Sequence, residues 1–573
     1  MQREKRWSIE EHDTERVRAF AHEIGEAPIV AALLISRGHD NPDSAERFLN
    51  PRLEHLHDPY LLTDMERAVE RILRAVDAKE KILVWGDYDV DGTTGTVVLR
   101  KAIDILGGIS TFHIPHRFRE GYGINIEHLG KAVEDGCSLV ISVDTGSRAF
   151  EAAEWARDNG IDLIISDHHL SDPEKGNPEA YAVVNPNRAD CPYPDKNLAG
   201  VGVAFKIAQA LLRARGKESL IPGFLKMVAI GTIADIMQLT GENRSIVSIG
   251  LRDLPSARNP GLRALMDVAD CREEMSSYDI GFRIAPRINA AGRMDEGRSV
   301  IELFDAKSFE DARRIAQRLD ELNRRRQEVQ AEIFQLALQT HVETSSREDS
   351  SHVAVVAGQG WHRGVIGLAS SKITDRLYRP SLVISIENGI GHGSGRSIEG
   401  FNLHDALESC KDVFEKFGGH AAACGFTVPE ARIGELRTRL NEYAKRNLTD
   451  EDLRPRLRID AKLKSSSINL GLVEALKRME PFGAGNPKPR FLASNLSLAG
   501  DPLIMKERHL KLRMGDMEGR AFEAVWWDGV EKAAHLDLKR NQVFSMAFTP
   551  DSNHWNGQTR LQLVVDDLRP DNP

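Results

Sequence analysis

Four short segments of this chain combine acidic and histidine side chains in a pattern that could support metal-dependent chemistry. They are GDYDVDG, with Asp87, Asp89 and Asp91; VDTG, with Asp144; DHH, with Asp167, His168 and His169; and GTIADIM, with Asp235. Three of them follow apolar runs of strand type, and the fourth lies in an apolar stretch that predicts a helix. Carboxylates that are packed closely repel one another unless a cation neutralises them. The four segments therefore predict a metal site.

The types of ligand narrow the choice of metal. Several carboxylates with one or two imidazoles suit Mn²⁺ or Mg²⁺, and the absence of cysteine from the set argues against structural zinc. Four or five carboxylates can hold two ions, which stabilise the attacking and leaving oxygens of a phosphoryl displacement. One such ion also lowers the pKa of a bound water. The chemistry that these residues predict is two-metal phosphoester hydrolysis.

Each segment alone also has a structural interpretation. DxDxDG can belong to a calcium loop, but the twelfth position from Asp87 is Val98 rather than the glutamate of an EF-hand. Asp144 could cap a helix, and a lone DHH is common on protein surfaces. Asp235 is harder to explain in this way, because a buried carboxylate without a partner is costly. The occurrence of all four in order, at the ends of successive strands, favours the metal site.

The elements that must position these residues alternate between strand and helix. From Lys81, short apolar runs such as ILVW, SLVIS and IDLIIS alternate with segments of helical pattern at 93–107, 126–136 and 148–159. This alternation predicts an α/β fold with a doubly wound parallel sheet. Ligands bind such sheets at the carboxyl ends of the strands, where the acidic segments are expected to meet.

The rest of the chain predicts further domains. Residues 1–60 have the pattern of a small helical cap and 61–305 that of the catalytic domain. Residues 309–340 read as one long helix with an apolar stripe, which suits a helix connecting two domains (306–342) or a coiled-coil dimer. A second α/β domain is expected at 343–450, after the polar stretch ETSSREDSS. Six short strand-like runs at 451–573 predict a C-terminal β-barrel of OB type.

Composition sets only broad limits. Hydrophobic residues make up 41% and charged residues 28% of the 573-residue chain, as is usual in globular proteins. The formal net charge is −10, but residues 453–573 hold 19 Lys and Arg against 15 Asp and Glu, so a local basic groove for nucleic acid remains possible. The five cysteines form no CxxC pair, and the N-terminus has no apolar segment of the signal-peptide type, so a cytoplasmic location is expected.

In their order, the four segments resemble the metal motifs of the DHH phosphoesterases, as written in RecJ-type exonucleases. The resemblance implies that the metal ligands are Asp89, Asp91, Asp144, His168 and Asp235. It makes Asp87 an additional ligand or a base close to the ions, with Asp144 and His169 also in catalytic roles, His169 orienting neighbours or contacting the scissile phosphate. Many relatives carry a histidine four residues before Asp89, where this chain has Trp85.

Other segments extend the resemblance to phosphate and DNA binding. IPHRFREGYG contributes Arg117, and RINAAGR contributes Arg293. The segments WHRGVIG, GSGRS and GGHAAACGF resemble the DHH-associated domain, and there the candidate phosphate ligands are Arg396, Ser397 and His420. Glycine-rich segments of this kind are usually only turns, which is the alternative here. Most aromatic residues of the β-rich region are expected in its core, while Trp555, in SNHWNGQT, is the candidate for stacking on a base.

The resemblance implies a 5′-to-3′ exonuclease specific for single-stranded DNA, dependent on Mn²⁺ or Mg²⁺ and releasing mononucleotides in recombination and repair. Its implied partners are single-stranded DNA, single-strand DNA-binding protein and a RecQ-type helicase, and the chain is expected to be a monomer. The alternatives are another DHH enzyme, such as an oligoribonuclease, a cyclic-dinucleotide phosphodiesterase or a pyrophosphatase, and a non-catalytic scaffold of the Cdc45 type. A dimeric binding protein built on the long helix would leave the carboxylates unexplained.

Overall fold

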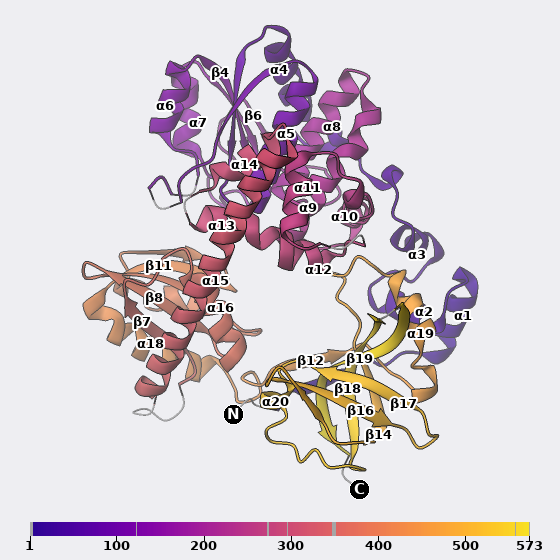
Figure 1. The fold of residues 1–573 in the computed structure, drawn as a ribbon. Coiled ribbons are helices and arrows are strands. Elements are labelled where there is room, and N and C mark those ends of the chain that lie inside the picture. The colour runs from indigo at the N-terminus through magenta and orange to yellow at the C-terminus, as the bar shows by residue number, and fades with distance from the viewer. Residues whose placement is uncertain are drawn as a thin grey trace. The chain divides into compact units, whose positions relative to one another are not determined.

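A computed structural model describes residues 4–571 of the chain, except 118, 122, 272, 273, 295, 346–350 and 556, and except the side chains of Ser345 and Trp555 (Figure 1). Two compact units emerge. The first, which we call the catalytic unit, comprises Leu34–Arg324 and Met479–Pro487, and the second comprises Met1–Leu33, Arg325–Arg478 and Lys488–Pro573. Among the described residues no single helix is long and apolar enough to cross a bilayer; one bent pair, α1 (Thr14–Ile24) with α2 (Pro28–Ser36), meets the criterion of length and composition only when taken together.

A five-stranded parallel sheet forms the centre of the catalytic unit. Its strands are β2 (Lys81–Gly86), β3 (Ile109–His113), β4 (Cys137–Val143), β5 (Asp162–Ser166) and β6 (Ala182–Val184), in the order β3-β2-β4-β5-β6. The chain builds outward from β2 in both directions, so the winding reverses between β2 and β4. Such a reversal creates a crevice at the carboxyl ends of the two strands. The predicted doubly wound sheet is confirmed.

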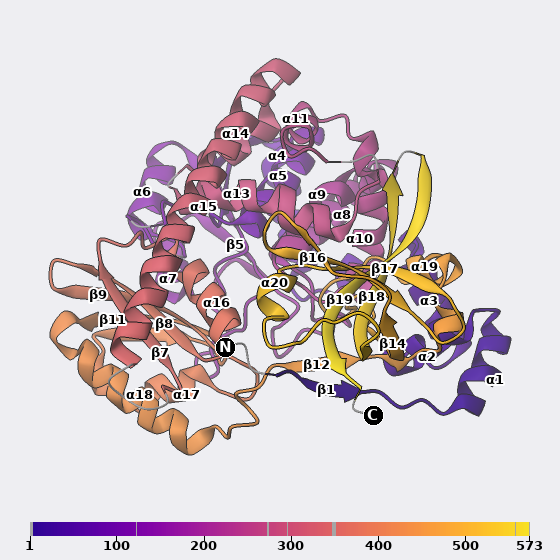
Figure 2. The ribbon, with the colours of Figure 1, turned by 60° about the horizontal axis from the view of Figure 1, so that its bottom comes forward.

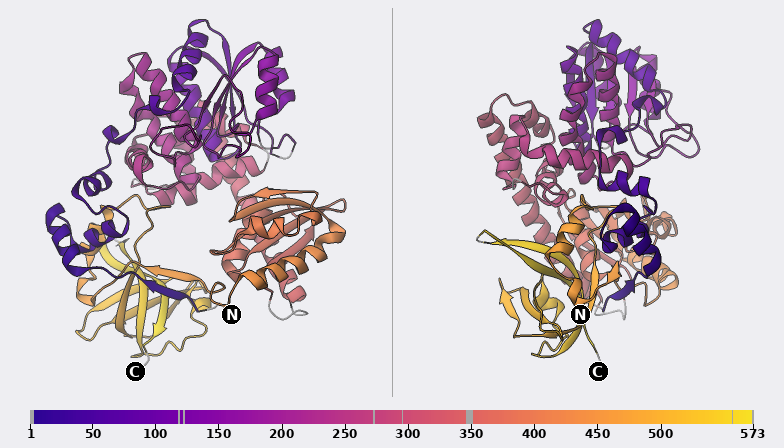
Figure 3. Two further views of the ribbon diagram at one scale, coloured as in Figure 1. Left: turned by 180° about the vertical axis from the view of Figure 1, so that it is seen from behind. Right: turned by 90° about the vertical axis from the view of Figure 1, so that its right-hand side faces the viewer.

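Helices cover both faces of this sheet, because successive side chains of a strand point to opposite sides (Figure 3). Ile82 and Val84 are buried in one cluster with residues of α4 (Met65–Asp77), α5 (Val90–Ile105) and α8 (Gly200–Ala214). Leu83 and Trp85 are buried in the other, with residues of α6 (Ile126–Glu134) and α7 (Phe150–Asp158). Apolar runs with no alternation are what a strand buried on both faces requires.

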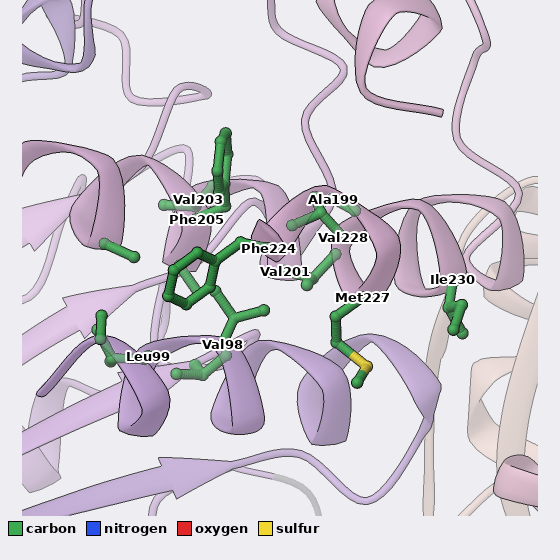
Figure 4. Close-up of a cluster of buried hydrophobic side chains, with 14 of the residues drawn as sticks. Val98, Leu99, Ala199, Val201, Val203, Phe205, Phe224, Met227, Val228 and Ile230 are labelled. Atoms are coloured by element: carbon green, nitrogen blue, oxygen red, sulfur yellow. The ribbon is translucent and has the colours of Figure 1, made fainter. Parts of the chain in front are cut away.

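Three helices beside the crevice are fixed by a shared apolar core. Val98 and Leu99 of α5, Val201 and Phe205 of α8, and Val228 of α9 (Leu225–Ala234) are almost fully buried together (Figure 4). The remaining helical elements of the unit are α3 (Pro42–Leu49), α10 (Gly241–Asp253), α11 (Pro260–Val268), α12 (Ser277–Asp279), the π-helical turn η5 (Ile280–Ile284), α13 (Ala285–Arg293) and α14 (Arg298–Asp305), with short 3-10 turns at Leu53–His55, Pro59–Leu61, Glu218–Phe224 and Leu254–Ser256.

The long helix predicted from residue 309 is α15 (Phe309–Ser345). Its first half contributes Ala312, Ala316, Leu319 and Leu322 to the core of the catalytic unit. Its second half places Ile333 and Ala337 in a separate core with β7 (Ala354–Gln359) and α16 (Ile366–Leu377). The apolar stripe is therefore buried within the chain itself, as expected of a helix that connects two domains.

A mixed sheet in the second unit contains β7, β8 (Ser381–Glu387), β9 (Ile390–Arg396), β10 (Lys416–Gly419) and β11 (Ala423–Pro429), in the order β10-β11-β9-β8-β7. Its other helices are α17 (Leu403–Glu408) and α18 (Ile433–Asn447), with 3-10 turns at Lys411–Val413 and Glu430–Arg432. GSGRS does not form the turn that its glycines suggest, since most of it belongs to strand β9. The segment pairs with β8 and β11, and its glycines serve packing: a Cβ on Gly393 would lie 2.0 Å from the ring of Phe426.

The C-terminal region forms the predicted barrel from β13 (Ala461–Lys462), β14 (Phe491–Leu498), β15 (Leu503–Met505), β16 (His509–Gly515), β17 (Ala521–Trp526), β18 (Val543–Trp555) and β19 (Gln558–Pro570). Pairing of β14 with both β18 and β16 closes it. Helices α19 (Leu470–Lys477) and α20 (Gly529–Lys532) and a 3-10 turn at Ser465–Ser467 accompany the strands. The N-terminal residues also form a strand that composition did not indicate, β1 (Arg6–Ile9), parallel to β12 (Arg456–Ile459) (Figure 2).

Candidate metal centre

The turn after β2 brings three aspartates to the crevice. Asp87 is buried directly after the strand, and Asp89 caps α5, its carboxylate accepting the backbone N–H of Gly92 at 3.0 Å. Gly92 has to be glycine, because a Cβ there would lie 2.5 Å from the backbone nitrogen of Asp87. Asp91 follows in the first turn of α5 and is fully buried. The tight turn therefore places three carboxylates within five residues.

The N-terminus of α8 binds the carboxylate of Asp91 and lies close to that of Asp144. The backbone N–H groups of Gly200 and Val201 each donate to Asp91, at 2.7 Å. A helix N-terminus is a favourable place for negative charge. A Cβ on Gly200 would lie 2.5 Å from Cβ of Asp144, so only glycine lets the helix approach both residues. Asp144 directly follows β4, has a positive φ of 63° and is buried.

The DHH turn after β5 is organised by its own aspartate. The carboxylate of Asp167 accepts the backbone N–H of Ser147 at 2.8 Å and the backbone N–H groups of His168 and His169 at 2.8 and 3.2 Å. It also lies 2.8 Å from Nδ1 of His169. Sequence analysis assigned Asp167 no role. Its signal was available, since a short acidic side chain before a turn commonly binds the next backbone N–H groups.

His168 and Asp235 complete the cluster. Nε2 of His168 lies 3.1 Å from Asp144 Oδ1, 3.7 Å from Asp235 Oδ2 and 3.8 Å from Asp91 Oδ2. Asp235 is the C-terminal cap of α9, which confirms the predicted helix. A carboxylate at a helix C-terminus faces the negative end of the helix dipole. A cation beside Asp235 removes that penalty.

We call Asp87, Asp89, Asp91, Asp144, His168 and Asp235 the switch-point cluster. Burial, with the charge of Asp89, raises the pKa of Asp87 to about 8 and that of Asp235 to about 7. Burial and the neighbouring carboxylates raise the pKa values of Asp91 and Asp144 well above the ordinary range. Oδ1 of Asp87 is buried and has no hydrogen-bond partner among the described residues. Such a set of carboxylates is unstable as anions without a counter-charge, which is the environment that divalent cations fill.

The pKa values of the two histidines of the DHH turn are shifted in opposite directions. Burial and the neighbouring His169 lower the pKa of His168 to about 4, so its imidazole is neutral, the form that binds a metal. Burial also opposes the charge on His169, but the hydrogen bond and charge of Asp167, with Asp235 and Asp91, raise its pKa to about 9. His169 is therefore a cation beside the cluster at neutral pH. This difference agrees with a ligand role for His168 and an orienting or phosphate-contacting role for His169.

Ligand atoms of the switch-point cluster fall into groups small enough to surround an ion. Asp91, His168 and Asp235 form one group, Asp87, Asp89 and Asp144 another, and in each the ligand atoms lie within 4.8 Å of one another. Asp144, His168 and His169 form a third group that joins the first two through shared residues. All five predicted ligands are thus brought together. Oxygen-rich groups with one neutral imidazole fit Mn²⁺ or Mg²⁺.

A pocket of about 330 Å³ opens on this cluster. Its lining includes the predicted residues Asp87, Asp89, Arg117, Asp144, His169, Asp235 and Arg293. Tyr88 and Asn289 also line it, although sequence analysis singled out neither. The guanidinium of Arg117 lies over the ring of Tyr88, 4.9 Å from its centroid. A Cβ on Gly292 would lie 2.2 Å from the carbonyl oxygen of Tyr88, so glycine lets α13 and its Arg293 approach.

The other predicted phosphate ligands lie in the second unit. Arg396 ends β9 and its Nη1 donates to the carbonyl oxygen of Gly395 at 2.8 Å. The hydroxyl of Ser397 donates to the carbonyl oxygen of Phe401 at 2.7 Å, and its backbone N–H donates to the carbonyl oxygen of Ala422. His420 is exposed in the β10–β11 hairpin, whose residue Ala423 pairs with Arg396. Their roles toward phosphate stay predictions.

Most aromatic residues of the barrel are in its core, as expected. Phe491, Trp526, Phe544 and Phe548 are almost fully buried. Trp527 is 50% exposed and was not singled out. The side chain of Trp555, the predicted stacking residue, lies outside the described part of the chain, although its backbone ends β18.

This sheet, with acidic turns and a DHH turn converging on its switch point, defines a DHH-type phosphoesterase domain. Family models agree: the DHH family N-terminal domain matches residues 81–232, the DHHA1 domain 349–446 and the RecJ OB domain 459–567. The chain belongs to the RecJ family.

Named relatives support this membership. The chain is 36% identical to the single-stranded-DNA-specific exonuclease RecJ of Bacillus subtilis, over 98% of this chain and 70% of that protein. It is 32% identical to the protein of the same name from Escherichia coli, over 95% and 96%. The crystal structure of RecJ in complex with Mn²⁺ from Thermus thermophilus matches with a TM-score of 0.85 and 28% identity, covering 99% of this chain and 80% of that one.

Proposed function

We propose that this chain is a metal-dependent exonuclease that degrades single-stranded DNA in the 5′-to-3′ direction, releasing 5′-mononucleotides in recombination and repair. The observation that carries the proposal is the convergence of five carboxylates and a neutral imidazole at one switch point, facing a pocket with Arg117 and Arg293. The names of the relatives supply the substrate, single-stranded DNA, and the family supplies the direction.

The residues proposed to hold the metals are Asp89, Asp91, Asp144, His168 and Asp235, with Asp87 as an added ligand or a base. Bound there, Mn²⁺ or Mg²⁺ would supply a water acidified for attack and charge that stabilises the phosphoryl oxygens. The structure of a relative that contains Mn²⁺ and another that contains Mg²⁺ support this choice of ions.

Side chains of the protein would supply the proton acceptor and the contact with the phosphate. Asp87, held by its turn with one oxygen unbonded among the described residues, is placed to accept a proton from the attacking water. His169 keeps its positive charge through Asp167 and can donate to the phosphate being cleaved. Asp167 acts through these neighbours, since it fixes the backbone and ring of the DHH turn.

Strand binding is assigned to both units. Arg117 and Arg293 line the pocket, where Arg117 would meet the terminal 5′ phosphate and Arg293 would contact the DNA backbone, and Arg396, Ser397 and His420 would supply further phosphate contacts. A fixed end pocket explains how an exonuclease measures from an end. The OB-type barrel would extend the path, with Trp555 stacking on a base. As partners we propose single-strand DNA-binding protein and a RecQ-type helicase, and the chain would act as a monomer in the cytoplasm.

A panel of substrates tests this function. The full chain is incubated with Mn²⁺ and labelled single-stranded DNA, duplex DNA and short RNA, and the products are resolved by length. Mononucleotides released from the 5′ end of single-stranded DNA are expected. Predominant degradation of RNA, or release from the 3′ end, would overturn the proposal.

A further inference from the structure

A second group of metal-binding side chains lies at the β3 edge of the parallel sheet, outside the switch-point cluster. It consists of His113, Glu120 and His128, which we call the histidine cluster. His113 ends β3, Glu120 lies in the connection that follows, and His128 is in the first turn of α6. Nε2 of His113 lies 2.7 Å from Oε2 of Glu120, and Nε2 of His128 lies 3.5 Å from the same oxygen. All three ligand atoms lie within 4.8 Å of one another.

These separations suit ligands around one small ion. Zinc–nitrogen bonds of about 2.0–2.1 Å in a tetrahedron put neighbouring ligand atoms about 3.3 Å apart. Two imidazoles with one carboxylate form the donor set of zinc sites that leave the fourth position open. The donor set also differs from that of the switch-point cluster, where oxygen dominates, so the two positions favour different metals.

The surroundings orient the three ligands toward one point. Nδ1 of His128 lies 3.3 Å from Oδ1 of Asn125, the cap of α6. With the proton on Nδ1, the Nε2 lone pair faces Glu120. The other carboxylate oxygen of Glu120 accepts the backbone N–H of His116 at 2.9 Å, which leaves Oε2 for the cluster. The buried ring of Trp85 lies 4.4 Å from the ring of His113 and forms one wall.

Hydrogen bonds alone would not engage all three side chains of the histidine cluster. One proton can bridge His113 and Glu120 at 2.7 Å, but the 3.5 Å separation of His128 from Glu120 is too long for a strong hydrogen bond. A divalent ion would replace the bridging proton and engage all three side chains.

We propose that His113, Glu120 and His128 bind one Zn²⁺, which restricts the motion of the connection between β3 and α6. That connection carries Arg117, which lines the pocket of the metal centre and covers Tyr88. The ion would tie the strand before Arg117 to the segment and helix after it. With two histidines, a glutamate and a water as its ligands, the ion would hold an arginine of the pocket in position, and it would take no part in the chemistry at the switch point.

Zinc binding can be measured free of the catalytic metals. The test uses the full chain carrying Asp144→Ala, freed of metal by chelation, and titrates it with ZnCl₂ alone by calorimetry. The same background carrying His113→Gln and His128→Gln removes two ligands. Glu127→Gln is the matched control, since Glu127 is on the same helix and forms an exposed ion pair with Lys131. Circular dichroism without zinc verifies that each variant is folded.

The Asp144→Ala background and the control are expected to bind one zinc equivalent that is weakened at least about 100-fold when both histidines are replaced, in addition to any zinc that Asp91, His168 and Asp235 hold in every variant. Hydrogen exchange at residues 113–128 should slow on adding zinc, only where the histidines are present. Equal affinity in all variants, or no binding in the background, would overturn the site. Binding without slower exchange would overturn the fastening role. The test contains no nucleic acid, so it is independent of the proposed nuclease function.

Discussion

The switch-point cluster and the histidine cluster belong to one sheet, yet they differ in almost every property that decides which ion binds. The first is acidic, with Asp87, Asp91 and Asp144 almost fully buried and Asp235 30% exposed, and its carboxyl pKa values are raised to about 8 at Asp87 and about 7 at Asp235. The second has two imidazoles for one carboxylate, and its side chains keep 15–25% of their surface exposed. The first should take hard ions used in catalysis, and the second a borderline ion used for structure.

The position in the sheet accounts for the difference. The reversal of winding between β2 and β4 lets turns from three strands, and a helix end, crowd their charges in one crevice. β3 is an edge strand with β2 as its one strand partner in the described part of the chain, so fewer turns meet at its carboxyl end. Few elements reach that place, and the ligands there come from one continuous stretch, 113–128. Many charges in one crevice suit a site that catalyses a reaction. A single short stretch whose side chains bind one ion suits a site that stabilises local structure.

Replacing Asp144 should produce the largest effect. Asp144→Ala removes a carboxylate shared by two groups of ligand atoms, and each 1.4 kcal/mol lost from the transition state costs tenfold in rate. Loss of several kcal/mol of metal-assisted stabilisation gives a fall in kcat/KM of about a thousandfold or more on single-stranded DNA with Mn²⁺. Asp158→Ala, on the surface of α7, serves as the control. Activity within tenfold of the parent chain would remove Asp144 from the centre.

Asp167→Asn should reduce activity by roughly 10- to 100-fold, the range seen when a group that orients metal ligands is altered. The amide keeps the shape but loses the charge that holds His169 as a cation. Calorimetry should show weaker Mn²⁺ binding, since His168 is fixed by the same turn. Asp172→Asn is a matched control, because Asp172 accepts two backbone N–H groups in a nearby turn. An unchanged Mn²⁺ affinity would contradict the positioning role.

Most residues of the switch-point cluster could be predicted from sequence because they follow strand-type runs, and the carboxyl ends of parallel strands meet, whereas Asp235 caps the end of helix α9. Asp167 and Asn289 were missed for different reasons. Asp167 acts on its own turn, so its signal is local but common to many turns. Asn289 reaches the pocket only because Gly292 lets α13 touch Tyr88, a contact between segments 204 residues apart in the sequence. The local pattern of apolar and polar residues carries no information about such a long-range contact.

The alternative interpretation of GSGRS, a simple turn, is not what the structure shows. Gly393 and Gly395 belong to strand β9, and they are glycines because Phe426 and Leu403 occupy the space that their side chains would take. Strand β1 was missed because its partner, β12, is 450 residues away in the sequence. The fold class follows from local pattern, whereas close packing and long-range pairing depend on residues that a local window never contains.

Arg396→Ala tests whether end recognition belongs to the second unit. Loss of a charge-assisted hydrogen bond to phosphate costs about 1.5–3 kcal/mol, or roughly 10- to 100-fold in KM, for DNA with a 5′ phosphate. DNA with a 5′ hydroxyl should lose much less. Arg446→Ala is the control, because Arg446 is an exposed arginine on α18 that forms an ion pair with Glu442. An equal loss on both substrates would assign Arg396 to general strand binding.

Replacing a histidine of the histidine cluster should have the smallest effect on the reaction. His128→Ala leaves every residue of the switch-point cluster in place, so kcat with saturating Mn²⁺ should stay within about twofold. Looser fastening of Arg117 should cost about 1 kcal/mol in substrate binding, which raises KM about fivefold. In the parent chain the same rise should follow selective removal of zinc and be reversed by restoring it, whereas the variant should not respond to zinc. A collapse of kcat in His128→Ala would mean that the two clusters act as one site, and that the division between a reactive and a structural metal position is wrong.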